Sequence, residues 1–170
     1  MLVPAAVYKD QIEKMSDYLR YSDKMMFYNG CTETGRIQIQ TDPTEGRYQW
    51  AILAKRRRAE DQDELVGYIS YMVDYYSSNA YGFGLISFTS DKRYKRAIAT
   101  GILEAIRHVN SLNLHRIEWR CVADNPAKVK YIGIMNKLDG EPHMCRLLDV
   151  FKDAYGQYHD MDIFEIIRNN

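Results

Sequence analysis

The sequence lacks paired cysteines, long apolar runs and a recognisable leader, and each absence argues against a class of protein. Its three cysteines, Cys31, Cys121 and Cys145, lie far apart, which disfavours a disulfide framework or a zinc site. The four histidines show no metal-ligand spacing, so we expect no metal. No apolar run reaches the ~18 residues of a transmembrane helix, and Met1–Val7 is too short for a signal-peptide core. We therefore expect a cytoplasmic protein with free thiols and no membrane partner.

The chain also lacks net charge, since Lys plus Arg and Asp plus Glu number 23 each. Binding that depends on charge must then come from local clusters instead of the whole surface. Two basic clusters are present, Lys55–Arg58 and Lys92–Arg96. The zero balance argues against a nucleic-acid partner. A module that binds nucleic acid through both clusters on one face stays as an alternative.

The chain does contain alternating strand and helix patterns over 170 residues, 46% of them hydrophobic, which suits one domain spanning residues 1–170. Three strand patterns joined by short turns predict an antiparallel meander, and a helix between two further strands predicts a parallel crossover pair. The fold class is α+β, with a mixed, mostly antiparallel sheet of about six or seven strands. The expected helices are 8–19, a less regular stretch at 22–28, 96–111 and 126–138, and the expected strands are 37–40, 48–54, 64–73, 80–88, 115–122, 144–151 and 158–167.

The turn at Asp91–Arg96 is the strongest candidate site, because it leads from the strand at 80–88 into a helix. The unpaired N–H groups of a first helical turn point outward and favour an anion. A solvated charged loop is an equally frequent explanation on composition alone. Cations at a helix start oppose the helix dipole, however, and Ala97 and Ala99 are small enough to let a ligand approach the backbone. Gly101, inside the helix, indicates close packing on the sheet or on a ligand.

Four segments, in this order, resemble the GNAT N-acetyltransferase superfamily, and within it the RimJ/RimL-like branch. No single segment is specific, but the order and spacing of all four together are. The resemblance covers about residues 48 to 167 and implies a GNAT-like sheet with helices on both faces. The four segments are Ala97-Ile-Ala-Thr100 in place of Gly-Tyr-Ala-Thr, Leu114-His-Arg-Ile-Glu118, the helix-opening Asn125, and Gly156-Gln-Tyr-His-Asp160 in place of Gly-x-Tyr/Trp-x-Asp.

The resemblance implies that acetyl-coenzyme A is the co-substrate. Its pyrophosphate would lie on the loop that matches the family pattern Gln/Arg-x-x-Gly-x-Gly/Ala, and its pantetheine arm would bind free backbone groups at the end of the preceding strand. Tyr94 replaces the leading Gln or Arg and Ala97 replaces the first glycine, so we expect weaker binding, partly offset by Lys95 and Arg96. The implied cofactor-binding residues are Phe88, Thr89, Tyr94, Lys95, Arg96, Ala97, Ile98, Ala99, Thr100 and Asn125.

The helix after Asn125 carries the implied catalytic acid, because a serine or tyrosine on this helix can protonate the leaving thiolate in the family. Counting forward from Asn125 gives Lys128, whereas counting back from Lys137–Leu138 gives Tyr131. The hydroxyl group favours Tyr131. A tyrosine that only fills a helix–sheet contact is an equal alternative.

Two carboxylates, Glu118 and Asp124, lie nearest the expected site along the chain. A base must take a proton from the attacking ammonium, directly or through water. Each carboxylate has two readings, as this base or as a surface or structural group. We name Glu118 as the catalytic candidate beside Tyr131.

The leading hypothesis is an acyltransferase, an N-acetyltransferase that moves an acetyl group from acetyl-coenzyme A to a primary amine of a small molecule or a protein N-terminus. The altered loop and the displaced Lys137–Leu138 favour, as the alternative, a GNAT-fold protein that binds coenzyme A or another ligand without turnover. We expect a monomer or a homodimer. A local group of five tyrosines could pack within the sheet or form an acceptor pocket or dimer surface, and we favour packing because tyrosine is common in strands. The group is Tyr68, Tyr71, Tyr75, Tyr76 and Tyr81.

Overall fold

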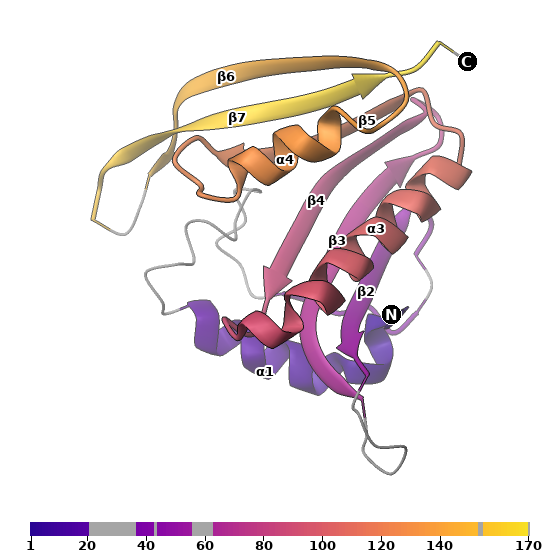
Figure 1. Ribbon diagram of the computed structural model, residues 1–170, viewed down its shortest axis with the longest axis vertical. Coiled ribbons are helices and arrows are strands. Elements are labelled where there is room, and N and C mark those ends of the chain that lie inside the picture. Colours follow the sequence, from indigo (N-terminus) through magenta and orange to yellow (C-terminus); the bar gives the residue numbers. More distant parts are fainter. Residues whose placement is uncertain (21–36, 43, 56–62, 153–154, 170) are drawn as a thin grey trace.

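A single seven-stranded sheet, in the order β1-β2-β3-β4-β5-β7-β6, organises the protein (Figure 1). The computed structural model describes residues 1–20, 37–42, 44–55, 63–152 and 155–169. The strands are β1 (Leu2–Pro4), β2 (Arg47–Ala54), β3 (Glu64–Asp74), β4 (Asn79–Ser87), β5 (Arg116–Val122), β6 (Glu141–Lys152) and β7 (Tyr158–Ile167). The helices are α1 (Lys9–Arg20), α3 (Lys95–Ser111) and α4 (Lys128–Met135), and short 3-10 turns cover Ala5–Tyr8 and Lys92–Tyr94. Within these ranges no helix is both long and apolar enough to cross a membrane.

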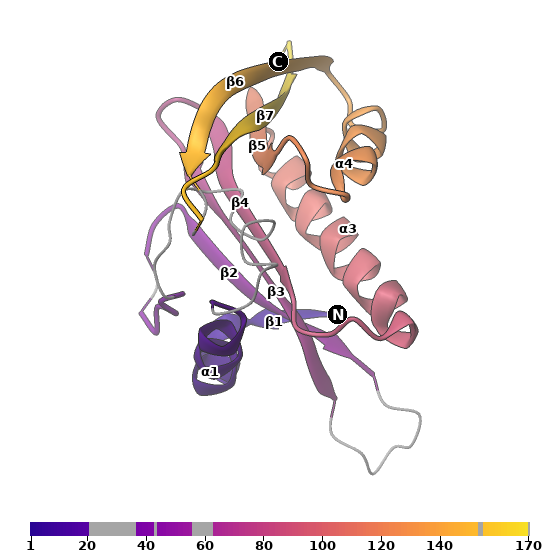
Figure 2. The same cartoon turned by 90° about the vertical axis from the view of Figure 1, so that its left-hand side faces the viewer.

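Helices cover both faces of the sheet, and Figure 2 shows α1 on one side with α3 and α4 on the other. Alternating residues of β2 explain why both faces are apolar. Ala51 and Leu53 join the smaller core cluster beside Ile12 of α1, whereas Ile52 and Ala54 join the larger cluster beneath α3. Every strand pair is antiparallel except β4 with β5. The predicted α+β class with a mostly antiparallel sheet and helices on both faces is therefore confirmed.

Three predicted elements differ from the structure. The strand at 37–40 is wrong: the Ile39 and Gln40 N–H groups donate to side-chain oxygens of Glu13 and Gln49 instead of to a neighbouring strand. The helix at 126–138 is shorter, because a turn precedes Lys128 and residues after Met135 return to the sheet through turns. The short edge strand β1 carries no alternating pattern and was missed. The expected helical stretch at 22–28 lies outside the described residues.

The parallel neighbours β4 and β5 pair at only two positions, Asn79 with Arg116 and Ala80 with Ile117. Beyond them the strands diverge, as Figure 1 shows. We call the space between Tyr81–Ser87 of β4 and Glu118–Val122 of β5 the β4–β5 wedge. β5 instead pairs along its whole length with β7. One edge of β4 is thus left without a strand partner from Tyr81 onward.

Gly101 sets how closely α3 lies on the sheet. A Cβ atom at this position would come within 2.9 to 3.2 Å of three side-chain carbons of Ile52 on β2. Such distances are tighter than ordinary van der Waals contact, so any larger residue must push α3 and β2 apart. The expectation of close packing at Gly101 is therefore confirmed, and the neighbour is the sheet.

We expect Gly101→Ala to lower the free energy of unfolding by roughly 1 kcal/mol, because crowding against Ile52 outweighs the gain in helix propensity. Gly133→Ala is the matched control: Gly133 lies within α4 and a Cβ there meets nothing within 4 Å. That control should raise stability by about 0.5–1 kcal/mol. Urea denaturation measures both changes. Equal stabilisation by the two alanines would contradict the close contact at Gly101.

Candidate functional site

A mostly apolar cavity of about 80 Å³ lies over the β4–β5 wedge, on the face that α3 and α4 cover. The strands β3, β4 and β5 and the helices α3 and α4 each contribute part of the wall. The wall includes Phe83 and Leu85 from β4, Ile102 from α3, Trp119 and Cys121 from β5, and Tyr131 from α4. A space of this size exceeds what a single water needs, about 10–15 Å³. The divergent strands thus leave an apolar space on the sheet face that α3 and α4 cover.

Tyr131, which the sequence favoured over Lys128 as the proton donor, lies in this cavity wall. Its ring packs 6.3 Å from that of Phe164 on β7. Burial, with a smaller contribution from nearby Cys121, raises the pKa of the Tyr131 hydroxyl to about 12. The hydroxyl therefore stays protonated at neutral pH, the state required of a proton donor.

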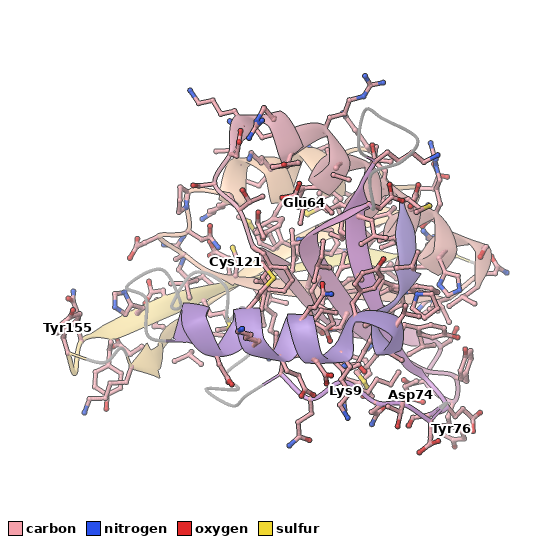
Figure 3. The ribbon with its side chains drawn as sticks, turned by 90° about the horizontal axis from the view of Figure 1, so that it is seen from below. Lys9, Glu64, Asp74, Tyr76, Cys121 and Tyr155 are labelled. Atoms are coloured by element: carbon pink, nitrogen blue, oxygen red, sulfur yellow. The ribbon has the colours of Figure 1, made fainter. Side chains whose placement is uncertain are left out.

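Cys121 also lines the cavity and is 1% exposed. Figure 3 shows its sulfur in the interior of the molecule. Burial and the negative charge of Asp162 raise the pKa of the Cys121 thiol to about 11. The thiol is consequently neutral and a weak nucleophile.

The basic loop enters α3 through the 3-10 turn Lys92–Tyr94. Asp91 accepts from the backbone N–H of Arg93 at 2.9 Å and pairs with its guanidinium, so Arg93 is already neutralised. Tyr94 turns away from the helix start, and its hydroxyl donates to Glu64 of β3 at 2.6 Å. No side chain caps α3, and its first turn contains no acidic residue. The exposed Lys95 and Arg96 thus lie at a helix start that no side chain caps, although the Lys95 N–H itself donates to the Lys92 carbonyl of the 3-10 turn. Such a start favours an anion.

The residues after Arg96 divide between the two sides of α3. Ala97 and Ile98 pack against the larger core cluster. Ala99 and Thr100 are exposed. Of the loop residues named from the sequence, Lys95 and Arg96 are therefore the exposed cations at the helix start, and Tyr94 is held by Glu64.

The end of β4 differs from the expectation of free backbone groups. The Phe88 N–H donates to the Val66 carbonyl at 3.0 Å, so this donor is already used. The Thr89 carbonyl accepts from the Ser87 hydroxyl at 2.8 Å. The first bond ties the end of β4 to β3, and the second lies within the turn after β4. The unpaired backbone edge lies earlier along β4, opposite the diverging part of β5.

Asn125 opens the α4 segment from a buried position, with 6% of its surface exposed. Its side-chain oxygen accepts from the Ala127 N–H at 2.8 Å, and its carbonyl accepts from the Lys128 N–H at 2.9 Å. The residue also lines the cavity. Asn125 thus fixes the connection from β5 to α4, which sets where Tyr131 lies.

A buried ion cluster holds the other side of α4. Asp162 of β7 is 1% exposed and pairs with Lys128 of α4, while Arg146 of β6 donates to it at 2.8 Å. Burial alone would raise the pKa of Asp162, but the hydrogen bonds from Arg146 and Lys128 outweigh it and keep that pKa below its ordinary value. Lys128 is therefore committed to an ion pair, whereas Tyr131 and Ile134 are the α4 residues that line the cavity.

Glu118 lies on the opposite side of β5 from the cavity, because residues alternate along a strand and Trp119 faces the cavity. Its two carboxylate oxygens accept from two guanidinium groups, Arg116 at 2.8 Å and Arg120 at 2.7 Å. The structure does not bring Glu118 together with Tyr131. Asp124 is exposed and lies 3.6 Å from His159.

Other sequence features have simpler surroundings. Tyr68 and Tyr71 are buried in the two core clusters, which confirms strand packing for these two, whereas Tyr75, Tyr76 and Tyr81 are exposed. Tyr76 projects from one end of the molecule and Tyr155 from the other (Figure 3). Lys55 is exposed, and residues 56–58 of its basic cluster lie outside the described part. Among described residues, no group of three or more His, Cys, Asp or Glu side chains could hold a metal ion.

Two residues of the site were missed from the sequence. Asp162 shares a face of β7 with Phe164 and Ile166, because residues alternate along a strand, and an acid on an apolar face signals a buried ion pair. Trp119 directly follows the matched segment that ends at Glu118. Alternation along β5 would have placed it beside Cys121 and opposite Glu118, once the strand's covered face was known.

The fold that these elements build is the GNAT acetyltransferase fold. The chain matches no protein-family model, and a search of curated proteins finds no match. Solved structures do match. The spermidine/spermine N-acetyltransferase SpeG from Vibrio cholerae, in complex with manganese ions, is 18% identical with a TM-score of 0.52, over 93% of this chain and 74% of that chain.

Two further structures agree. A dodecameric spermidine N-acetyltransferase from Vibrio cholerae in an intermediate state is 21% identical over 72% of this chain and 65% of that chain, with a TM-score of 0.50. A probable GNAT-family acetyltransferase from Chromobacterium violaceum is 15% identical over 73% of this chain and 60% of that chain, with a TM-score of 0.52. These identities support a shared fold.

We expect Asp162→Asn to lower the free energy of unfolding by roughly 1–3 kcal/mol at pH 7, because Lys128 and Arg146 lose their common partner. Denaturation by urea measures the loss. A carboxyl whose pKa is lowered on folding stabilises the protein above its unfolded pKa, so the difference between the two proteins should stay constant above about pH 5. It should shrink as the pH falls below about 4, through the lowered pKa of Asp162. A pH-independent difference would exclude ionised Asp162 as the source.

Proposed function

We propose that the protein is an N-acetyltransferase that uses acetyl-coenzyme A and acetylates a primary amine. The observation that carries the proposal is the position of Tyr131, a protonated hydroxyl in the cavity over the β4–β5 wedge. The fold of the solved acetyltransferases supports it. The four ordered sequence segments further support the RimJ/RimL-like branch, and the free Cys121 and Cys145 suit a reducing cytoplasm.

The residues present fit an acyl-coenzyme A ligand at both of its chemical ends. The start of α3 offers uncapped N–H groups with Lys95 and Arg96 beside them, which suits a pyrophosphate. The cavity offers an apolar wall and an unpaired strand edge on β4, which suit a pantetheine arm with its amides. Tyr94, Ala97, Ile98, Ala99 and Thr100 would frame the loop, and Phe88, Thr89 and Asn125 would shape the cavity entrance.

Acetyl-coenzyme A supplies the acetyl group as a thioester. Tyr131 would donate its proton to the departing sulfur and regain one from solvent. Burial of the hydroxyl among apolar side chains keeps it protonated until that step. The neutral Cys121 thiol would remain a wall of the cavity, without attacking the thioester.

For Glu118 we propose a positioning role. The Glu118 carboxylate pairs with the guanidinium groups of Arg116 and Arg120 on the side of β5 opposite the cavity, so it does not face an amine bound there. Arg116 also pairs with Glu165 on β7, so Glu118 and Glu165 together hold Arg116 on the face of the sheet opposite α4. The proton of the ammonium would then leave to water.

The acceptor is proposed to be an amine of a small molecule or a protein N-terminus. Two of the similar structures are polyamine acetyltransferases, which makes spermidine the first amine to test. We propose a monomer or homodimer. The alternative, a protein that binds coenzyme A without turnover, is favoured by Tyr94, whose hydroxyl is committed to Glu64 at the family's leading loop position.

We expect millimolar acetyl-coenzyme A to raise the melting temperature by several degrees, since a ligand at 100 times its Kd adds about 2.7 kcal/mol. Thiol release should then appear with spermidine, simple primary amines or a peptide with a free N-terminus, and not with the same peptide blocked at its N-terminus. No thermal shift would overturn the proposed function. A shift without thiol release across the panel would favour binding without turnover.

Tyr131→Phe should lower kcat by about 100-fold and change the Kd for acetyl-coenzyme A less than about twofold, because only the proton donor is removed. In the wild-type protein, ionisation of this hydroxyl should cause no loss of kcat between about pH 7 and pH 10, since its pKa is about 12. Tyr76→Phe, at a fully exposed position, is the control. An unchanged kcat in Tyr131→Phe would remove the hydroxyl from the reaction.

A further inference from the structure

The indole of Trp119 contains a polar group that nothing in the described chain satisfies. Trp119 is 8% exposed, and its ring lines the cavity. The indole nitrogen Nε1 is buried and has no hydrogen-bond partner among the described residues. Indole N–H is a donor only, so an acceptor is what this position lacks.

An unpaired buried donor is unfavourable, and buried tryptophan N–H groups usually find a partner. The rest of the Trp119 surroundings is well ordered. The ring stacks on Phe164 with centroids 5.6 Å apart and planes 10° apart. The backbone of β5 is paired to β7 on both sides of Trp119. The missing acceptor is therefore not a sign of a loosely packed strand. Among the described residues, Trp50, Asn79 and Arg116 also carry an unpaired buried polar atom, but of the four side chains Trp119 is the one that lines the cavity.

Trp119 and Tyr131 converge on the same part of the cavity. Both rings pack on Phe164, at 5.6 Å and 6.3 Å between centroids. Trp119 is also two residues beyond Ile117, where β4 and β5 last pair. The indole and the ring of the proposed proton donor thus share Phe164 as a neighbour, and the indole lies near the paired end of the wedge.

We propose that the Trp119 indole N–H donates a hydrogen bond to a carbonyl oxygen of an acyl-thioester arm bound in this cavity. The inference rests on the proposed function and adds a binding residue to it. A carbonyl is the acceptor that an acyl-pantetheine chain offers, once in its thioester and again in its two amides. Trp119 would therefore fix the depth at which the arm lies relative to the Tyr131 hydroxyl.

The test is Trp119→Phe, which keeps an aromatic ring on Phe164 and removes the N–H. Isothermal titration with coenzyme A and with acetyl-coenzyme A gives the Kd values, and thermal unfolding without ligand gives the stability. Trp50→Phe is the matched control, because Trp50 lies on β2 against the His108 ring and outside the cavity wall described here. Trp119→benzothienylalanine is a second variant that keeps the bicyclic shape and lacks only the N–H.

We expect both Trp119 variants to bind about three- to tenfold more weakly than wild type, the range for one hydrogen bond. The benzothienylalanine variant without ligand should melt no lower than wild type, since an unsatisfied donor has been removed. Weaker binding of both ligands assigns the partner to a pantetheine amide, and weaker binding of acetyl-coenzyme A alone assigns it to the thioester.

Wild-type affinity in the benzothienylalanine variant overturns the inference, as does a loss of affinity accompanied by an equal loss in Trp50→Phe. A lower melting temperature without ligand, with affinity unchanged, assigns the indole to packing and also overturns it. Failure of the wild-type protein itself to bind either ligand is a different result, because it removes the proposed function and not the role of Trp119 alone.

Discussion

The structure depends on how little β4 and β5 pair. Two paired positions join the halves of the sheet, whereas β5 pairs with β7 along its whole length. A continuous parallel ladder would bring the strands within about 5 Å of each other and close the cavity. Along one edge, β4 therefore lacks strand partners beyond Ala80, and the space that results lies beneath α3 and α4. A ligand that carries its own amides can replace those missing partners.

The divergence requires that the second half of the sheet be held by other means. Asp162 does this from within β7, because it joins α4 through Lys128 and β6 through Arg146. The three elements that lie beyond the wedge are thus connected by one buried carboxylate. The charge of Asp162 positions α4, because an apolar residue at 162 could pack against the helix but could not bind Lys128 at its first residue.

The sequence predicts the scaffold well because periodicity reports burial directly. The strands at 48–54 and 64–73 and the helix at 96–111 each appear within one or two residues of their predicted bounds. Elements whose bonds depend on distant partners were harder to predict. The segment at 37–40 alternates like a strand, yet its N–H groups bond to Glu13 and Gln49, which pattern alone does not reveal. The same distinction, between what chain order predicts and what depends on distant partners, applies to the site residues. Tyr131 follows from chain order, whereas the occupied Phe88 N–H and the paired Glu118 depend on contacts made across the sheet.

The contact between Gly101 and Ile52 places the dimensions of the cavity under the control of a strand that does not line it. The same helix contributes the cations at its start and the cavity wall at Ile102, and its distance from the sheet is set by the contact of its Gly101 with Ile52 of β2. Ile52 therefore acts as a spacer. The width of the cavity then depends on a side chain that does not line it, and changes of single methyl groups at this core contact should alter that width.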